Sequence, residues 1–235
     1  MMFTAVEPAA YFGQGEREPY AHALLTGSGA LTLRPEGAHY PAEPVEFDVR
    51  NWCEDADATE RSLLQSLRGP VLDIGCGPGR LLAAAQPLGL AALGIDASAE
   101  AVRQARGRGA RVLEQSIFAP VPQPGHWQSV ILLDGNIGIG GSVTALLGRC
   151  RQLIAPTGTL LVEVDADENI DTAYSAVLED RHGNRSEAFA WARIGTAGLA
   201  SRAPAAGWSI AAIQRLQGRV FCRLSPGRMP VRSIP

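Results

Sequence analysis

Three closely spaced glycines follow a short apolar run in the stretch VLDIGCGPGR, residues 71–80. An acid, Asp73, lies inside this run, and a helix is expected to begin after the last glycine. Glycines let the backbone approach a ligand closely, and the free amide groups at a helix start can face the polar part of a nucleotide. The stretch therefore predicts a nucleotide-binding loop, whose residues are Gly75, Cys76, Gly77 and Gly79.

The spacing of the glycines discriminates between two kinds of nucleotide. A dinucleotide-binding turn has the form G-x-G-x-x-G or G-x-G-x-x-A, in which the third small residue allows close packing of the helix. Here that third position is Arg80, which is a poor choice for close packing. The glycines form G-x-G-x-G instead, a tighter loop that suits a ligand without a pyrophosphate, such as an adenosine carrying an amino acid.

A second acid stands where the next strand is expected to end. Asp96 closes the run ALGID and comes 17 residues after Gly79. A carboxylate can accept two hydroxyl hydrogen bonds at once, and the end of a strand places it well to hold a ribose. Asp96 is therefore the candidate ribose ligand.

Together these features resemble the first two motifs of the class I S-adenosylmethionine-dependent methyltransferases, and the resemblance covers about residues 60–224. It implies that S-adenosylmethionine is the cofactor and S-adenosylhomocysteine the product. It also implies that the glycine loop gives room to the cofactor, that Asp73 lies near the methionine ammonium group and that Asp96 binds both ribose hydroxyls.

The adenine end of the site departs from the family pattern. The family often has an Asp after the third strand, where it binds the adenine amino group, whereas this sequence has Ser116. A serine can still form a hydrogen bond, but it carries no charge. Ile117 and Ala97 could sandwich the adenine ring. The alternative is that Ser116 and Ile117 are only a strand end and a core residue.

The stretch LLDGNIGIGGS, residues 132–142, follows the fourth expected strand and has four glycines within seven residues. In the family, the loop at this position borders the methyl group and the acceptor. Asp134 and Asn136 are therefore candidate catalytic residues, and Asp134 is also a candidate cofactor contact. Asp134 could accept a proton or orient an acceptor amine. The alternative is that the glycines form turns and Asp134 caps a backbone amide.

Methyl transfer from a sulfonium is a direct displacement, so the enzyme mainly aligns the acceptor with the methyl group and excludes water. One general base often suffices, and some acceptors need none. Besides Asp134, the candidates for a base are Asp165, His182, His126, His22 and His39.

Short apolar segments alternate with helical ones from residue 71 onwards. Strands are expected at residues 71–74, 91–95, 112–116, 130–133 and 159–164, and helices at 55–67, 80–86, 98–108, 142–154 and 196–206. This alternation predicts an α/β fold with a Rossmann-like, doubly wound, mostly parallel sheet and helices on both faces. Two further runs flank Gln217-Gly218 and predict an antiparallel hairpin at the C-terminal end of the sheet.

Two domains are expected. Residues 1–54 would form an N-terminal extension or lid, with two short strands around a turn at 34–37, and residues 55–235 the cofactor-binding domain, with a hairpin insertion at 168–195. The aromatic residues of the two covering segments could wall a small apolar substrate, or could form the core of each lid. They are Tyr11, Phe12, Tyr20, Tyr174, Phe189 and Trp191.

Composition narrows the classes of partner. The formal charge is −3, every basic residue is arginine, and the densest arginine group fits the polar face of one helix. This indicates no nucleic-acid partner, because such proteins carry clustered positive charge. The four cysteines lack the spacing of zinc ligands, so no metal site is predicted. The absence of an 18-residue apolar run and of a signal-like N-terminus predicts no membrane partner and a cytoplasmic location.

The sequence thus predicts an enzyme that transfers a methyl group to O or N of a small-molecule metabolite or natural product, as a monomer or homodimer. One alternative is a non-catalytic protein of the same fold that binds S-adenosylmethionine or S-adenosylhomocysteine. Another is a nicotinamide-dependent oxidoreductase, which Arg80 at the third motif position disfavours.

Overall fold

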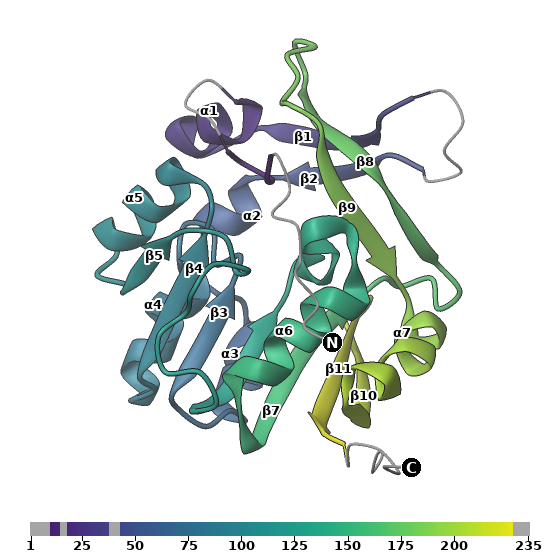
Figure 1. Ribbon diagram of the computed structural model, residues 1–235. Helices are drawn as coiled ribbons and strands as arrows, with labels where there is room; N and C mark the ends of the chain where they lie inside the picture. Colours follow the sequence, from purple (N-terminus) through teal and green to yellow (C-terminus); the bar gives the residue numbers. More distant parts are fainter. Residues whose placement is uncertain (1–9, 15–17, 38–42, 228–235) are drawn as a thin grey trace.

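A computed structural model describes residues 10–14, 18–37 and 43–227 of the chain. Figure 1 shows two β-sheets, a larger one with its helices below and a smaller one above it. The larger sheet has seven strands in the order β10-β11-β7-β6-β3-β4-β5, and the smaller has four in the order β2-β1-β8-β9.

The larger sheet confirms the predicted fold class. Its strands are β3 (Val71–Ile74), β4 (Ala92–Asp96), β5 (Val112–Glu114), β6 (Trp127–Leu132), β7 (Ile154–Val164), β10 (Trp208–Leu216) and β11 (Arg219–Pro226). Strands β3 to β7 are parallel, whereas β11 pairs antiparallel with both β7 and β10. The predicted C-terminal hairpin, with its turn at Gln217-Gly218, is thereby confirmed.

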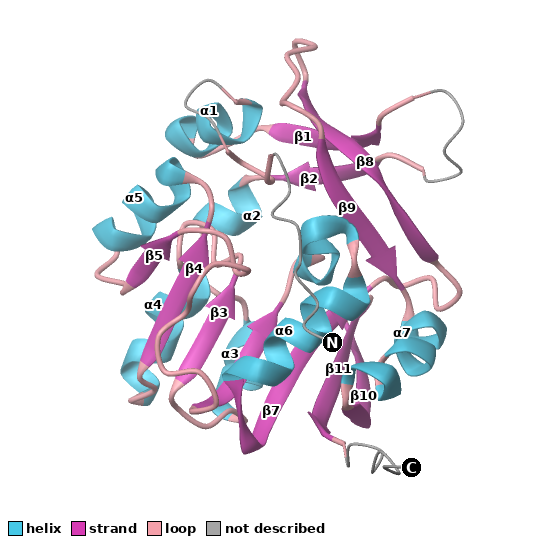
Figure 2. Ribbon diagram, viewed as in Figure 1, coloured by secondary structure: helices cyan, strands magenta, loops and turns pink. Residues whose placement is uncertain are grey.

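Helices cover both faces of this sheet (Figure 2). The helices are α3 (Ala58–Gln65), α4 (Arg80–Ala85), α5 (Ala99–Gly107), α6 (Val143–Leu153) and α7 (Thr196–Arg202), with short 3-10 turns η1 (Gln86–Leu88), η2 (Asn136–Gly141) and η3 (Pro204–Ala206). Strand residues alternate between the faces, so Leu72 packs in the core cluster that contains α6, while Val71 packs in the cluster that contains α3.

The helix starts follow from local capping. Asp57 accepts from the backbone N–H of Glu60 while the Glu60 side chain accepts from that of Asp57, so α3 begins later than the predicted residue 55. Ser98 caps α5, and Ser142 caps α6.

The order of the strands in the larger sheet determines where the site lies. From β3 the chain runs outward through β4 to β5 and then returns to β6, on the other side of β3. Open α/β sheets bind ligands at such a switch point, beyond the carboxyl ends of the strands. The loops that follow β3 and β6 are therefore neighbours. The first is the glycine loop, and the second, within residues 132–142, is called the Asp134 loop.

The smaller sheet joins the two segments that the sequence treats as separate lids. It contains β1 (Ala30–Pro35), β2 (Val45–Asp48), β8 (Asp171–Asp180) and β9 (Phe189–Ile194), flanked by α1 (Pro19–Thr26) and α2 (Arg50–Cys53). Strand β1 pairs antiparallel with β2 on one side and with β8 on the other. The N-terminal extension and the insertion therefore form one continuous cover. The boundary between two domains, expected between residues 54 and 55, stays a prediction.

Some boundaries differ from those expected. Strand β5 ends at Glu114, so Ser116 and Ile117 lie in the turn after it. Gly183-Asn184 is a pair typical of tight turns, and the chain does turn tightly here: the N–H of Gly183 donates to the carbonyl of Asp180 and the N–H of Asp180 to the carbonyl of Asn184, both at 3.0 Å. Glu179 and Arg185 form an antiparallel bridge beside this turn. Within the described residues, no helix has the length and apolar character needed to cross a membrane.

Candidate active site

The glycine loop depends on three left-handed backbone positions. Gly75, Gly77 and Gly79 have φ angles of 71°, 54° and 84°. Only glycine adopts such angles without strain. A Cβ atom on Gly79 would also lie 2.8 Å from the Cβ of Ala105 on α5. Gly79 therefore allows the start of α4 to pack closely against α5.

Asn136 holds this loop from the side. Its Nδ2 group donates to the carbonyl oxygens of Ile74 and Gly75, at 3.1 and 2.9 Å. A Cβ atom on Gly75 would lie only 2.6 Å from that Nδ2 atom. Asn136, which the sequence predicts as a catalytic residue, therefore supports the backbone of the glycine loop.

Replacing Asn136 by Ala should cost about 1–3 kcal/mol in the free energy of unfolding, because two largely buried carbonyl groups lose their donor. Urea unfolding of the Asn136→Ala variant measures this loss. The exposed Asn169, changed to Ala in the same way, should change the free energy by less than about 0.5 kcal/mol. Equal effects of the two changes would contradict the buttressing role.

Asp96 lies at the end of β4, as predicted, and its carboxylate is oriented by the backbone. Oδ2 accepts from the N–H of Gly77 and Oδ1 from the N–H of Ser98, both at 2.8 Å. The residue is 9% exposed. Burial raises its pKa to about 6, although the backbone hydrogen bonds from Ser98 and Gly77 oppose the shift. The carboxylate is thus fixed against the glycine loop and charged at neutral pH.

A cavity lies between the glycine loop and the smaller sheet, with about 890 Å³ of space including the part open to solvent. Most of the predicted site residues line it, namely Gly75, Cys76, Gly77, Asp96, Ala97, Ser116, Ile117, Asp134 and Asn136. Asp73 and Gly79 do not. The size lies in the range of small-molecule and cofactor sites. We call this space the first cavity.

Aromatic side chains roof the first cavity. Phe12 lies at the centre, with ring centroids 5.1 Å from Tyr20 and 5.5 Å from Trp191. These three come from the two predicted lids and meet because β1 pairs with β8. Phe47 and Trp52 complete the roof and were not predicted; the apolar positions of the alternating run VEFD and the nearby tryptophan are the only signals for them. The predicted Tyr174 lines a different hollow.

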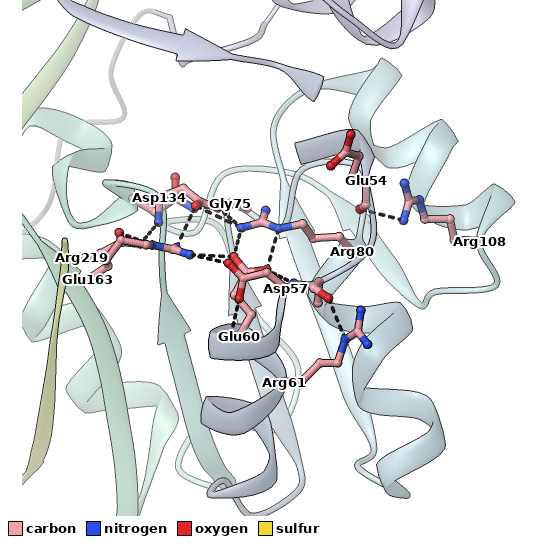
Figure 3. A network of polar contacts seen from close by, with 12 residues as sticks. Glu54, Asp57, Glu60, Arg61, Gly75, Arg80, Arg108, Asp134, Glu163 and Arg219 are labelled. Atoms are coloured by element: carbon pink, nitrogen blue, oxygen red, sulfur yellow. Dashed lines mark hydrogen bonds and ion pairs between the residues drawn. The ribbon is translucent and has the colours of Figure 1, made fainter. Parts of the chain in front are cut away.

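Beneath the loop lies a network of buried and half-buried ion pairs, shown in Figure 3. Arg80, 6% exposed, donates to the carboxylate of Glu60 from α3 and to both oxygens of Asp134, at 2.9 and 3.0 Å. Arg219 from β11 reaches Asp134, Glu60 and Glu163 at 3.2, 3.0 and 2.7 Å. Arg80, which disfavours a dinucleotide turn, is therefore the central residue of this network.

Asp134 is held inside this network. Its backbone is left-handed, with φ of 56°, and its N–H donates to Glu163 Oε2 at 2.8 Å. Burial raises the pKa of its carboxyl group, the Arg80 guanidinium opposes this, and the Glu163 carboxylate adds to it. Because both oxygens accept from arginines, Asp134 fixes the loop as well as bordering the first cavity.

Asp73 lies beneath the loop and not on the cavity wall. It is 2% exposed, and its Oδ2 atom has no hydrogen-bond partner among the described residues. Burial raises its pKa to about 8, Arg80 opposes the shift, and the carboxylates of Asp134 and Asp96 reinforce it. At neutral pH this buried acid therefore carries a proton, and a contact with a methionine ammonium group stays a prediction.

The raised pKa of Asp73 predicts a pH effect on stability. An acid with a higher pKa in the folded than in the unfolded chain binds its proton more tightly when folded. Its stabilising contribution is complete below about pH 4 and is lost as pH rises to about 8. The Asp73→Asn variant lacks this loss. We expect it to melt several degrees above the native protein at pH 8, and by a smaller margin at pH 5.

Thermal unfolding at the two pH values tests this expectation. Asp55→Asn is the control, because the Asp55 side chain is 90% exposed. A melting difference between Asp73→Asn and native protein that is the same at both pH values would contradict it.

The other candidates for a base are spread over the fold. Asp165 lies at the end of β7 and pairs with Arg193 at 2.6 Å. His22, His126 and His182 are exposed, and they line neither the first cavity nor the second cavity that adjoins it. His39 lies outside the described residues.

A family model described as a methyltransferase domain matches residues 48–198. This match spans more than half of the 235 residues, so the chain belongs to that family. The matched residues include β3 to β6, and with them the glycine loop, Asp96 and the Asp134 loop. Family and fold together confirm the prediction of an S-adenosylmethionine-dependent methyltransferase.

Solved structures share the fold at low identity. A SAM-dependent methyltransferase from Bacteroides fragilis, in complex with S-adenosyl-L-homocysteine, is 18% identical with a TM-score of 0.74, over 90% of this chain and 96% of that one. The CcbJ methyltransferase from Streptomyces caelestis is 14% identical with a TM-score of 0.58, over 75% and 92%.

The 1,6-didemethyltoxoflavin-N1-methyltransferase from Burkholderia thailandensis is 14% identical with a TM-score of 0.52, over 72% of this chain and 77% of that one. No curated protein sequence matches the chain.

Proposed function

We propose that this protein transfers the methyl group of S-adenosylmethionine to an oxygen or nitrogen atom of a small-molecule acceptor. The observation that carries the proposal is the first cavity, in which the glycine loop, Asp96 and the aromatic roof surround one space. A roofed cavity fits a small acceptor better than a nucleic-acid strand, which needs an open, positively charged surface. The related Burkholderia structure holds a small molecule, 1,6-didemethyltoxoflavin, together with S-adenosylhomocysteine.

The residues of the first cavity suit the adenosine part of this cofactor. The fixed carboxylate of Asp96 suits the two ribose hydroxyls. Ala97 and Ile117 line the cavity next to it and suit the adenine ring. The Ser116 hydroxyl accepts from the N–H of Phe118 at 3.1 Å, which leaves its own proton free for a ring nitrogen. When bound, the cofactor supplies a methyl group activated by the sulfonium charge.

The chain's own contribution to the reaction is alignment and the exclusion of water. Asn136 fixes the loop on which the cofactor rests. The roof of Phe12, Tyr20 and Trp191 covers the cavity and keeps water from the reacting atoms. Asp134 borders the cavity and can orient an acceptor, whereas accepting a proton would compete with its hydrogen bonds from Arg80 and Arg219.

Calorimetric titration with S-adenosylhomocysteine tests the cofactor, and micromolar affinity is the expected result. Absence of binding would overturn the proposal. Formation of S-adenosylhomocysteine from S-adenosylmethionine, measured with a mixture of small-molecule acceptors, then separates the enzyme from the alternative of a binding protein without turnover. Binding without product formation from any acceptor supports that alternative.

A further inference from the structure

A second cavity adjoins the first and opens over the carboxyl ends of β6 and β7. It has about 1580 Å³ of space, including the part open to solvent. The two cavities share Phe47, Trp52, Arg80, Asp134 and Trp191 in their linings. The second cavity therefore meets the first at the Asp134 loop, and it is not lined by Ser116 or Ile117, at the adenine end.

The second cavity is acidic. Nine carboxylate residues and three arginines line it. At its floor, Glu60, Asp134, Glu163 and Asp165 pair with the three arginines. The floor is thus close to neutral, and the excess negative charge comes from another part of the lining.

The excess charge lies on one continuous segment, residues 46–57, which forms the rim. Its acids are Glu46, Asp48, Glu54, Asp55 and Asp57. The ion pairs of these acids with described residues are long ones, both 3.7 Å, between Asp55 and Arg108 and between Asp57 and Arg219. Arg50, the one basic residue of the segment, does not line the cavity. A cleft lined by one sign of charge raises the local concentration of ligands of the opposite sign.

The boundary that the two cavities share is largely aromatic. Phe47, Trp52 and Trp191 line both of them. The rings of Phe47 and Trp52 have centroids 5.2 Å apart. The face of an aromatic ring, of tryptophan above all, attracts an organic cation. The acidic rim and the aromatic boundary are independent features of the second cavity, and both favour a ligand with positive charge.

We propose that the acceptor enters through the second cavity and is a small organic cation, an amine that is protonated in water, so that the methylated atom is nitrogen. This inference rests on the function proposed above. The ammonium group first loses one proton to water at the mouth of the cavity. The amine lone pair then forms the N–C bond to the methyl carbon, while the C–S bonding pair moves onto sulfur and cancels its positive charge. The product leaves as the N-methylammonium ion, which stays protonated in water, so the transfer releases one proton in all, the one lost before the N–C bond forms.

The test compares matched pairs of probes that differ only in charge. The pairs are tryptamine with tryptophol, phenethylamine with phenethyl alcohol, and hexylamine with hexanol. Binding to protein saturated with S-adenosylhomocysteine is measured by calorimetry and by ligand-observed NMR. We expect at least one amine to bind tenfold or more tightly than its alcohol, and to yield its N-methyl derivative in the presence of S-adenosylmethionine.

Two triple variants locate the effect. Glu46→Gln/Glu54→Gln/Asp55→Asn neutralises three rim acids and should abolish most of the preference for the amine. Glu114→Gln/Glu168→Gln/Glu187→Gln removes the same charge from residues outside both cavities, and should leave the preference unchanged.

Neither triple variant should change the affinity for S-adenosylhomocysteine, because none of the six residues lines the first cavity. Equal binding of amines and alcohols, no binding of any amine, or an equal effect of the two triple variants would overturn the inference. If S-adenosylhomocysteine itself does not bind to the native protein, the proposed function fails instead.

Discussion

Replacement of Asp96 by Ala should weaken the binding of S-adenosylhomocysteine at least tenfold, which corresponds to about 1.4 kcal/mol or more. The carboxylate borders the first cavity and is held by the N–H groups of Gly77 and Ser98. Its removal takes away the acceptor for two ribose hydroxyls and leaves two backbone donors without a partner. Calorimetric titration of the variant and the native protein measures the difference.

The charge of Asp96, apart from its shape, can be tested with pH. Because burial raises its pKa to about 6, the carboxylate becomes protonated as the pH falls through that value. A protonated carboxyl group is a poorer acceptor, so the affinity of the native protein should fall below pH 6. The Asp96→Asn variant, which does not titrate there, should bind weakly with no such change. A tenfold loss in Asp96→Ala with a flat pH profile in the native protein would contradict the role of the charge.

The cofactor side of the site was predictable because its signals are local. The loop glycines and Asp96 stand at fixed offsets from two apolar runs, and each strand end determines where they lie. The fold confirms this arrangement, since β3 and β4 are parallel neighbours with Asp73 opposite Gly94 in register. A motif that depends on short spacing within one β-loop-α unit can be recognised without knowledge of the rest of the chain.

The charge network was not predictable for the opposite reason. Arg80 meets Glu60, 20 positions before it, and Arg219, 139 positions after it, joins the same carboxylate. From the sequence alone, Arg80 indicated only that the glycine loop does not match a dinucleotide-binding turn. No periodicity indicates which of the 24 acidic residues will be buried beside it.

The roof of the cavity was predictable in part. Phe12, Tyr20 and Trp191 stood out as aromatic residues in the covering segments, but nothing in the sequence joins residue 33 to residue 178. The antiparallel pairing of β1 with β8 does so, and it merges two lids into one sheet. Phe47 and Trp52 owe their position in the roof to that same sheet and to the helix that follows β2.

The buried arginine predicts the largest effect on stability. In the Arg80→Met variant, Glu60 and Asp134 would keep Arg219 as their remaining arginine partner, in a region that also holds the buried Asp73. Removing one partner of a buried pair leaves uncompensated charge and costs about 3–5 kcal/mol. For a chain of this size, that corresponds to a fall in melting temperature of roughly 10 °C. Thermal and urea unfolding of the variant measure both quantities.

A surface pair provides the matched control. Arg103 pairs with Glu100 on α5, but its side chain is 64% exposed and the pair is screened by solvent, so Arg103→Met should leave the free energy of unfolding almost unchanged. The double variant Glu60→Leu/Arg80→Met should lose less than the sum of the two single changes, because it removes both members of the buried pair together. If Arg80→Met cost no more than Arg103→Met, the network would be too well hydrated to behave as buried. The arginine would then be a residue of the cavity wall and not the support beneath the glycine loop.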